Sequence, residues 1–249
     1  GYTISGLQIG LDNTTYNGIF TYVQANGRIE NLNVENCTYV NTTSNQTKFI
    51  GMIAALNHGT IVGCNVKSCR IEDRKSGYAG GIVCNNLGYI FNCLVDNVQF
   101  IGNAMYSGGL CYGNERDGEI VNCSVAQCHF IENAKSGGLC YNVAGGSNLL
   151  NCYVYSLDAG NSALGALLYQ NRGGLIDYCY YQEDSNLKAM YSNSYNEGKI
   201  YTYDSNFTVI DTGESLLDAL NAWIEDNQEK HPDYPLWRWQ AGDGNIPFV

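Results

Sequence analysis

The chain has 249 residues, enough for one elongated domain with a sizeable core. Its formal net charge is −11, which argues against nucleic acid or an anionic membrane as a partner, because those ligands reward clusters of Lys and Arg. No apolar run is long enough to span a bilayer, and the chain opens in mid-pattern at Gly1, so we expect any export signal or anchor to precede it.

A sequence repeat occupies most of the chain, from about Ile4 to Tyr181. Its clearest copy starts with Gly108-Gly109-Leu110-Cys111-Tyr112 and continues with Ile120-Val121-Asn122-Cys123-Ser124-Val125. Copies aligned on Cys123 recur at steps of roughly 25 to 32 residues, a period typical of solenoids. The aligned positions are Leu7, Leu32, Cys64, Cys93, Cys123, Cys152 and Cys179.

Within each copy, apolar residues alternate with polar ones over short runs. Cys123 with Val125 and Cys128 with Phe130 show the period of two that sends alternate side chains to one face of a strand. A third, more apolar run contains Leu110 and Cys111. We therefore expect three short strands and three bends per coil, with successive coils stacked in register.

This arrangement predicts an all-β fold: a parallel β-helix, or solenoid, of about six to seven coils spanning residues 1–181. We expect it to be right-handed, as parallel crossovers nearly always are. An Asn column stands at one bend, where stacked amides can hydrogen-bond along the pile (Asn31, Asn92, Asn122, Asn151). An outward column, Glu35, Lys67 and Asp96, places opposite charges on neighbouring coils and is interpreted as a solvated face.

The alternation of Gly-Gly-aliphatic-x-Tyr-x-Asn with Gly-x-Ile-x-Asn-Cys-x-Val resembles the Glug motif of bacterial surface proteins. The best copies are 80–95, 108–125 and 137–154. The resemblance implies a secreted or surface-anchored protein, often adhesin-like, and it implies no catalytic residue. The motif also occurs beside the catalytic domains of some large surface peptidases.

Eleven Cys residues would suggest disulfides, but the number is odd and the residues fall in stacked columns. Neighbouring rungs aim their Cβ atoms side by side, so we expect buried free thiols acting as small apolar side chains. The Cys-x4-Cys spacing of Cys64 to Cys69 has no accompanying His, and we expect no zinc.

The pattern breaks after Tyr181, and we interpret residues 182–249 as a C-terminal capping segment. The spacing of Leu216, Leu220, Trp223 and Ile224 predicts an amphipathic helix over about 214–227, with Thr212 or Ser215 as its N-cap. We expect this segment to close the exposed edge of the solenoid.

No converging set of carboxylates marks a catalytic centre in the repeat columns. His129 with Glu132 is the nearest acid–base pair, and the turn Glu115 to Glu119 lacks the alternating acidic pattern of a calcium loop. We expect no metal and no cofactor.

Tyrosine is the residue type that most clearly suggests a binding function. Tyr153 and Tyr180 share an outward slot on successive coils, and together with Tyr155 and Tyr178 they form the predicted ligand-binding surface, since exposed rings stack on sugars or contact proteins. Further tyrosines crowd the same third of the chain (Tyr191, Tyr195, Tyr201, Tyr203). The alternative is that these rings pack between the last coil and the capping segment.

The sequence therefore predicts a non-catalytic, secreted or cell-surface, adhesin-like module that binds glycan or protein or serves as a display arm. The alternative is a carbohydrate-active β-helix enzyme, a polysaccharide lyase or glycoside hydrolase. Expected partners are an extracellular glycan or a host or matrix protein, with no nucleic acid and no direct membrane insertion.

Overall fold

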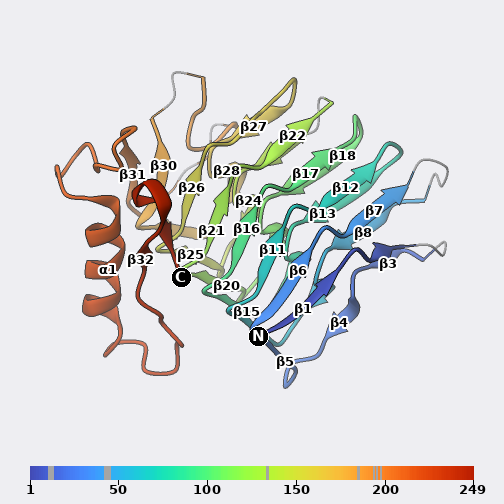
Figure 1. Ribbon diagram of the computed structural model, residues 1–249, viewed down its shortest axis with the longest axis horizontal. Coiled ribbons are helices and arrows are strands. Elements are labelled where there is room, and N and C mark those ends of the chain that lie inside the picture. The colour runs from blue at the N-terminus through green and yellow to red at the C-terminus, as the bar shows by residue number, and fades with distance from the viewer. Residues whose placement is uncertain are drawn as a thin grey trace.

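The computed structural model describes residues 1–10, 14–41, 46–132, 135–183, 186–192, 194, 196 and 198–249. The chain winds into a parallel β-solenoid of about six turns, and one helix follows near the C-terminus (Figure 1). The predicted all-β solenoid with a C-terminal helix is thus confirmed.

Each of the first five coils contributes one short strand to each of five parallel sheets, which we name A to E in the order in which the chain visits them. The sixth coil contributes a strand to every sheet except B. Sheet A holds β1 (Tyr2–Ser5), β6 (Leu32–Glu35), β11 (Asn65–Lys67), β16 (Leu94–Asp96), β21 (Ser124–Ala126), β26 (Tyr153–Tyr155), β30 (Cys179–Gln182) and β31 (Ile200–Tyr203). Sheet B holds β2 (Gln8–Ile9), β7 (Thr38–Asn41), β12 (Arg70–Asp73), β17 (Gln99–Ile101) and β22 (His129–Ile131).

The remaining three sheets complete each coil. Sheet C holds β3 (Tyr16–Asn17), β8 (Lys48–Gly51), β13 (Gly77–Gly80), β18 (Met105–Gly108), β23 (Lys135–Gly137) and β27 (Ala163–Gly165). Sheet D holds β4 (Phe20–Val23), β9 (Ala54–Asn57), β14 (Val83–Asn86), β19 (Cys111–Asn114), β24 (Cys140–Ala144) and β28 (Leu168–Arg172). Sheet E holds β5 (Arg28–Glu30), β10 (Thr60–Val62), β15 (Tyr89–Phe91), β20 (Glu119–Val121), β25 (Asn148–Leu150) and β29 (Leu175–Asp177).

The expectation of three strands per coil was wrong, because the corners are sharper than the apolar spacing indicates. Asn122 and Gln127, with φ of 58° and 52°, turn the chain by a single left-handed residue at each end of β21. Such a one-residue corner separates two strands without interrupting the inward apolar pattern, so the run from Ile120 to Phe130 folds as three strands rather than two.

Equivalent side chains lie over one another inside the coil, as the repeat predicts. Ile61, Ile90 and Ile120 pair in register and are fully buried. All eleven cysteines are buried free thiols, as their stacked columns predict. Along the main column the thiols of Cys93, Cys123 and Cys152 each accept a hydrogen bond from the backbone N–H of the cysteine one coil earlier, for example Cys93 N–H to Cys123 Sγ at 3.4 Å.

The Asn column forms a ladder at the corner between sheets E and A. Its members all adopt left-handed φ values of 50–58°. Asn122 Nδ2 donates to Asn92 Oδ1 at 2.6 Å, and Asn151 Nδ2 donates to Asn122 Oδ1 at 2.9 Å. This confirms that stacked amides hydrogen-bond along the pile.

The C-terminal segment begins with β31, which adds a last parallel strand beside β30. Helix α1 (Leu216–Asn227) follows, with Ser215 as its N-cap: the Ser215 Oγ accepts a hydrogen bond from Asp218 N–H. The chain ends with β32 (Gln240–Ala241), the 3₁₀ turn η1 (Asp243–Asn245) and β33 (Pro247–Phe248), in which β32 and β33 pair antiparallel.

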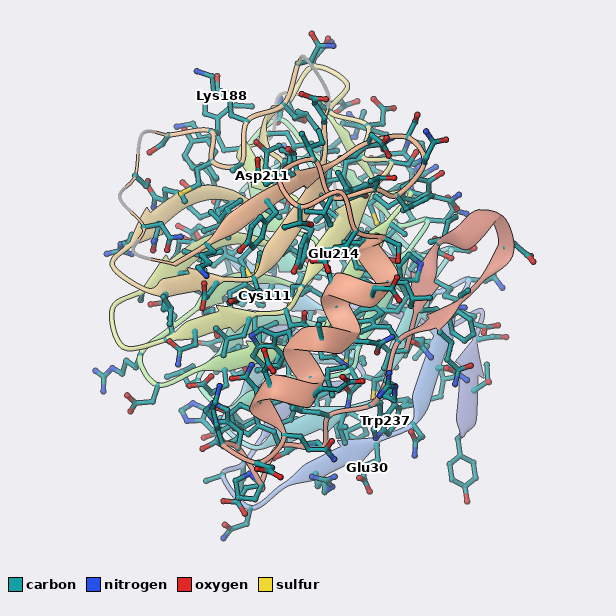
Figure 2. All side chains as sticks on the ribbon, turned by 90° about the vertical axis from the view of Figure 1, so that its left-hand side faces the viewer. Glu30, Cys111, Lys188, Asp211, Glu214 and Trp237 are labelled. Atoms are coloured by element: carbon teal, nitrogen blue, oxygen red, sulfur yellow. The ribbon has the colours of Figure 1, made fainter. Side chains whose placement is uncertain are left out.

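The helix lies on the flank of the solenoid rather than over its end, unlike the expectation. Its apolar stripe packs on the outward residues of sheet E, which form a second buried cluster with it (Val62, Phe91, Val121, Leu150). Figure 2 shows α1 crossing the stacked strands, with the segment around Trp237 beside them. The Asn ladder holds this segment, because Asn122 Nδ2 also donates to Trp237 O at 2.8 Å and Asn151 Nδ2 to Leu220 O at 3.1 Å. No helix in the described part of the chain is long and apolar enough to cross a membrane.

Candidate functional site: a ladder of aromatic rings

Two of the four predicted ligand-binding tyrosines are not on the surface. Tyr153 and Tyr180 do occupy an outward slot of sheet A on successive coils, but they are only 1% and 2% exposed. Tyr153 Oη donates to Pro247 O, and its ring meets Trp239 edge-on at 5.4 Å. The expected exposure was wrong because the C-terminal segment folds back over this slot.

The other two predicted tyrosines are partly exposed at the margins of the same contact. Tyr155 packs against Phe207 at 5.3 Å, and Tyr178 lies 5.9 Å from Tyr201, with Lys199 Nζ 5.2 Å from the Tyr178 ring centroid. Tyr203 is buried, whereas Tyr195 lies outside the described residues. These tyrosines mainly attach the C-terminal segment to the solenoid, which is the alternative that the sequence left open.

A different set of aromatic side chains runs along the outer faces of sheets C and D. In sheet C the residues are Tyr16, Phe49, Tyr78 and Tyr106, in register on consecutive coils. In sheet D and its continuation they are Tyr112, Tyr141, Tyr169 and Tyr191, each directly after a residue paired across the coils. We call these eight residues the aromatic ladder.

The rings of the ladder touch in an unbroken series. Successive centroids lie 5.1, 5.3, 4.5, 5.0, 4.8 and 5.3 Å apart through Tyr16, Phe49, Tyr78, Tyr112, Tyr141, Tyr169 and Tyr191. Tyr106 joins the series at 5.8 Å from Tyr78 and 5.4 Å from Tyr141. With parallel strands spaced about 4.8 Å apart, six steps give the ladder a length of roughly 29 Å.

Glycine makes the contact between the two columns possible. A Cβ on Gly108 would lie 1.9 Å from Cys111 O and 2.7 Å from Cys140 Cα, so β18 and β19 meet at a corner too tight for any side chain. The equivalent positions on other coils are equally closed (Gly51, Gly80, Gly137, Gly165). This corner brings Tyr78 of sheet C within 4.5 Å of Tyr112 of sheet D.

The ladder is neither buried core nor a fully exposed row. Tyr16 and Tyr191 at its ends are 40% and 52% exposed, and the six rings between them are intermediate. Partial burial among neighbouring phenols raises the pKa of Tyr141 to about 12 and also raises that of Tyr112, so both rings are neutral at physiological pH. Lys135 replaces an aromatic residue in the sheet C column, with its Nζ 5.7 Å from the Tyr106 centroid and 5.9 Å from that of Tyr169. Because most of these rings stack face to face, the outer surface here combines apolar ring edges with phenol hydroxyls and one ammonium group.

His129 and Glu132, the nearest acid–base pair that the sequence offers, have other partners in the structure. His129 Nδ1 lies 3.2 Å from Asp158 Oδ2 on the next coil, and Glu132 instead pairs with Arg74. The hydrogen bond from the Gly160 amide lowers the pKa of Asp158, and the contact with His129 lowers it further. Both His129 and Asp158 are exposed, so this is a surface ion pair.

Within the described residues, no group of three or more His, Cys, Asp or Glu side chains is placed to hold a metal ion. In the acidic turn, Glu119 accepts from Asn148 Nδ2 at 2.7 Å, and burial raises its pKa.

The sequence repeat already contained the tyrosine positions that form the aromatic ladder. Tyr112 and Tyr141 occupy the Tyr position of the phrase Gly-Gly-aliphatic-x-Tyr, and Tyr78 and Tyr106 precede the Gly pair by two residues. Their recurrence at the repeat period was visible in the sequence, but the meeting of the two columns was not, because it depends on the Gly corner.

The fold and this surface define the class of protein: a parallel β-solenoid whose outer face carries a continuous aromatic ladder. No protein-family model matches the chain, and no curated protein matches it significantly. Among solved structures, it is similar to a Bacteroides ovatus crystal structure described as a "putative immunoglobulin A1 protease". The two are 18% identical with a TM-score of 0.38, over 99% of this chain and 74% of the other.

Proposed function

We propose that the protein is a non-catalytic binding module of the secreted or cell-surface, adhesin-like kind, and that the aromatic ladder binds a linear glycan. The observation that carries this proposal is the unbroken series of partly exposed rings from Tyr16 to Tyr191. The stacked tyrosine rings offer a row of apolar edges for the C–H groups of a sugar and hydroxyls for its polar rim.

The regular spacing of the ladder favours a polymer over a compact ligand. Each coil offers an equivalent ring one strand spacing further on, so successive sugar units of an extended chain would meet the same chemistry. The formal charge of −11 disfavours a polyanionic glycan, and we propose a neutral one. The resemblance of the repeat to the Glug motif supports a surface location.

The test is a glycan array followed by calorimetry with the best oligosaccharide. Tyr141 contacts three other rings of the ladder, so Tyr141→Ala is expected to weaken binding at least fivefold, consistent with about 1 kcal/mol for lost aromatic contacts. Tyr141→Phe keeps the ring and should retain most of the affinity.

Tyr89→Ala is the matched control, because Tyr89 is also exposed, at 44%, but belongs to sheet E. Equal losses in Tyr141→Ala and Tyr89→Ala, or no binding to any glycan, would overturn the proposal. Release of new reducing ends during incubation would instead favour the alternative, a polysaccharide-cleaving enzyme.

A further inference from the structure

A cavity of about 300 Å³ lies where the C-terminal hairpin of β32 and β33 approaches the outer face of sheet A. It is separate from the aromatic ladder, which lies on sheets C and D. Its lining includes residues of sheet A and of the hairpin (Lys67, Asp96, Ala126, Tyr155, Pro247, Phe248).

The floor of this cavity is one column of sheet A. Glu35, Lys67, Asp96, Ala126 and Tyr155 pair in register on five consecutive coils. Ala126 is the smallest member, and its missing side-chain volume leaves space between Asp96 and Tyr155. This column was predicted to be a solvated charged face, but the C-terminal hairpin partly covers it.

The roof is held in a fixed position by the solenoid. Tyr153 Oη donates to Pro247 O, and the Trp239 ring packs edge-on against Tyr153. Pro247 is buried, whereas Phe248 is 43% exposed at the mouth of the cavity.

The two charged side chains of the floor, Lys67 and Asp96, attract each other from adjacent coils but form no direct ion pair. Lys67 and Asp96 are both partly buried, and neither side chain forms a hydrogen bond or ion pair with any residue in the described parts of the chain. Burial raises the pKa of Asp96, an effect that the nearby Lys67 opposes. Partly desolvated charges without a direct ion-pair or hydrogen-bond partner are costly, and a ligand that carries both opposite charges would pair with the two at once.

We propose that this cavity binds a small zwitterion of the α-amino-acid class. The ligand ammonium would pair with Asp96 and its carboxylate with Lys67, which lie on adjacent coils about 4.8 Å apart. An apolar side chain would occupy the space over Ala126 between Tyr155 and Phe248. The cavity volume is at the lower end for ligand sites, which suits a ligand of this size.

The test is calorimetric titration of the full chain with L-leucine, in parallel with 4-methylpentanoate, which lacks the ammonium, and 3-methylbutylamine, which lacks the carboxylate. L-leucine is expected to bind saturably and at least tenfold more tightly than either monofunctional compound. Comparable affinities for all three probes would contradict the proposal, as would the absence of saturable L-leucine binding.

Substitutions then locate the site. Asp96→Asn and Lys67→Gln should each weaken L-leucine binding at least tenfold, and Ala126→Phe should abolish it by filling the space. Glu35→Gln is the control, because Glu35 belongs to the same column but does not line the cavity, and its affinity should stay within twofold of wild type. Unchanged binding in Asp96→Asn and Lys67→Gln would refute the assignment.

Thermal unfolding of each variant checks that the fold is retained. Tyr141→Ala should leave L-leucine binding intact, so this proposal stands or falls independently of glycan binding by the aromatic ladder. If Ala126→Phe abolished the binding of a neutral monosaccharide but left L-leucine binding unchanged, the cavity would bind sugars instead, and the proposal would be overturned.

Discussion

Replacing Asn122 by Ala should be among the most destabilising substitutions at a polar position of this chain. Asn122 is fully buried and takes part in three side-chain hydrogen bonds: to Asn92 Oδ1, to Trp237 O and from Asn151 Nδ2. At about 1 kcal/mol each, their loss costs about 3 kcal/mol. Asn122 also has φ of 58°, and an alanine in that left-handed conformation adds about 1–2 kcal/mol. The expected loss in the free energy of unfolding is therefore about 4–5 kcal/mol.

Asn97→Ala separates the two contributions. Asn97 has nearly the same φ, 52°, but it is exposed, and its Nδ2 makes only a 3.3 Å hydrogen bond to Ser68 Oγ. Replacing Asn97 by Ala should lower the free energy of unfolding by about 1–2 kcal/mol, mostly because alanine is unfavourable in the left-handed backbone conformation. Urea unfolding followed by tryptophan fluorescence measures both values. Equal losses in the two variants would refute the view that the buried amide ladder stabilises the fold.

Three further predictions concern the corner glycines, the tyrosines and the thiols. Gly108→Ala should cost more than about 4 kcal/mol or prevent folding, since its Cβ would lie 1.9 Å from Cys111 O, whereas Gly145→Ala, with no atom nearer than 3.7 Å, should be nearly neutral in urea unfolding. In the folded protein the pKa of Tyr141 is about 12, above its ordinary value of 10.0. The contribution of this group to the free energy of unfolding is therefore present below pH 10 and is lost as the pH rises through 12. Denaturant midpoints and phenolate absorbance measured along a pH series check this. The eleven cysteines should not react with a thiol reagent until the chain unfolds, because all are buried and burial raises the pKa of Cys128 to about 12; rapid labelling of the native protein would contradict the buried columns.

Much of the solenoid could be predicted from the repeat, because stacked coils place identical side chains over one another. The columns of Ile120, Cys123 and Val125, the free thiols and the Asn corner all followed from spacing and residue chemistry. The helix was predicted over 214–227 and found at Leu216–Asn227, since its apolar stripe has the helical period.

The number of strands per coil could not be predicted, because a left-handed residue such as Gln127 turns the chain without leaving a gap in the apolar pattern. The exposure of Tyr153 was misjudged for a different reason. Its outward direction follows from the repeat, but its burial depends on Pro247 and Trp239, which lie about ninety residues further along the chain and outside the periodic part.

The most direct test of the account is a crystal structure of the protein with the oligosaccharide that the array identifies. The account predicts sugar rings packed along the exposed edges of Tyr112, Tyr141 and Tyr169, with successive units on successive coils. An oligosaccharide bound elsewhere, with the rings of these three tyrosines left uncovered, would contradict it.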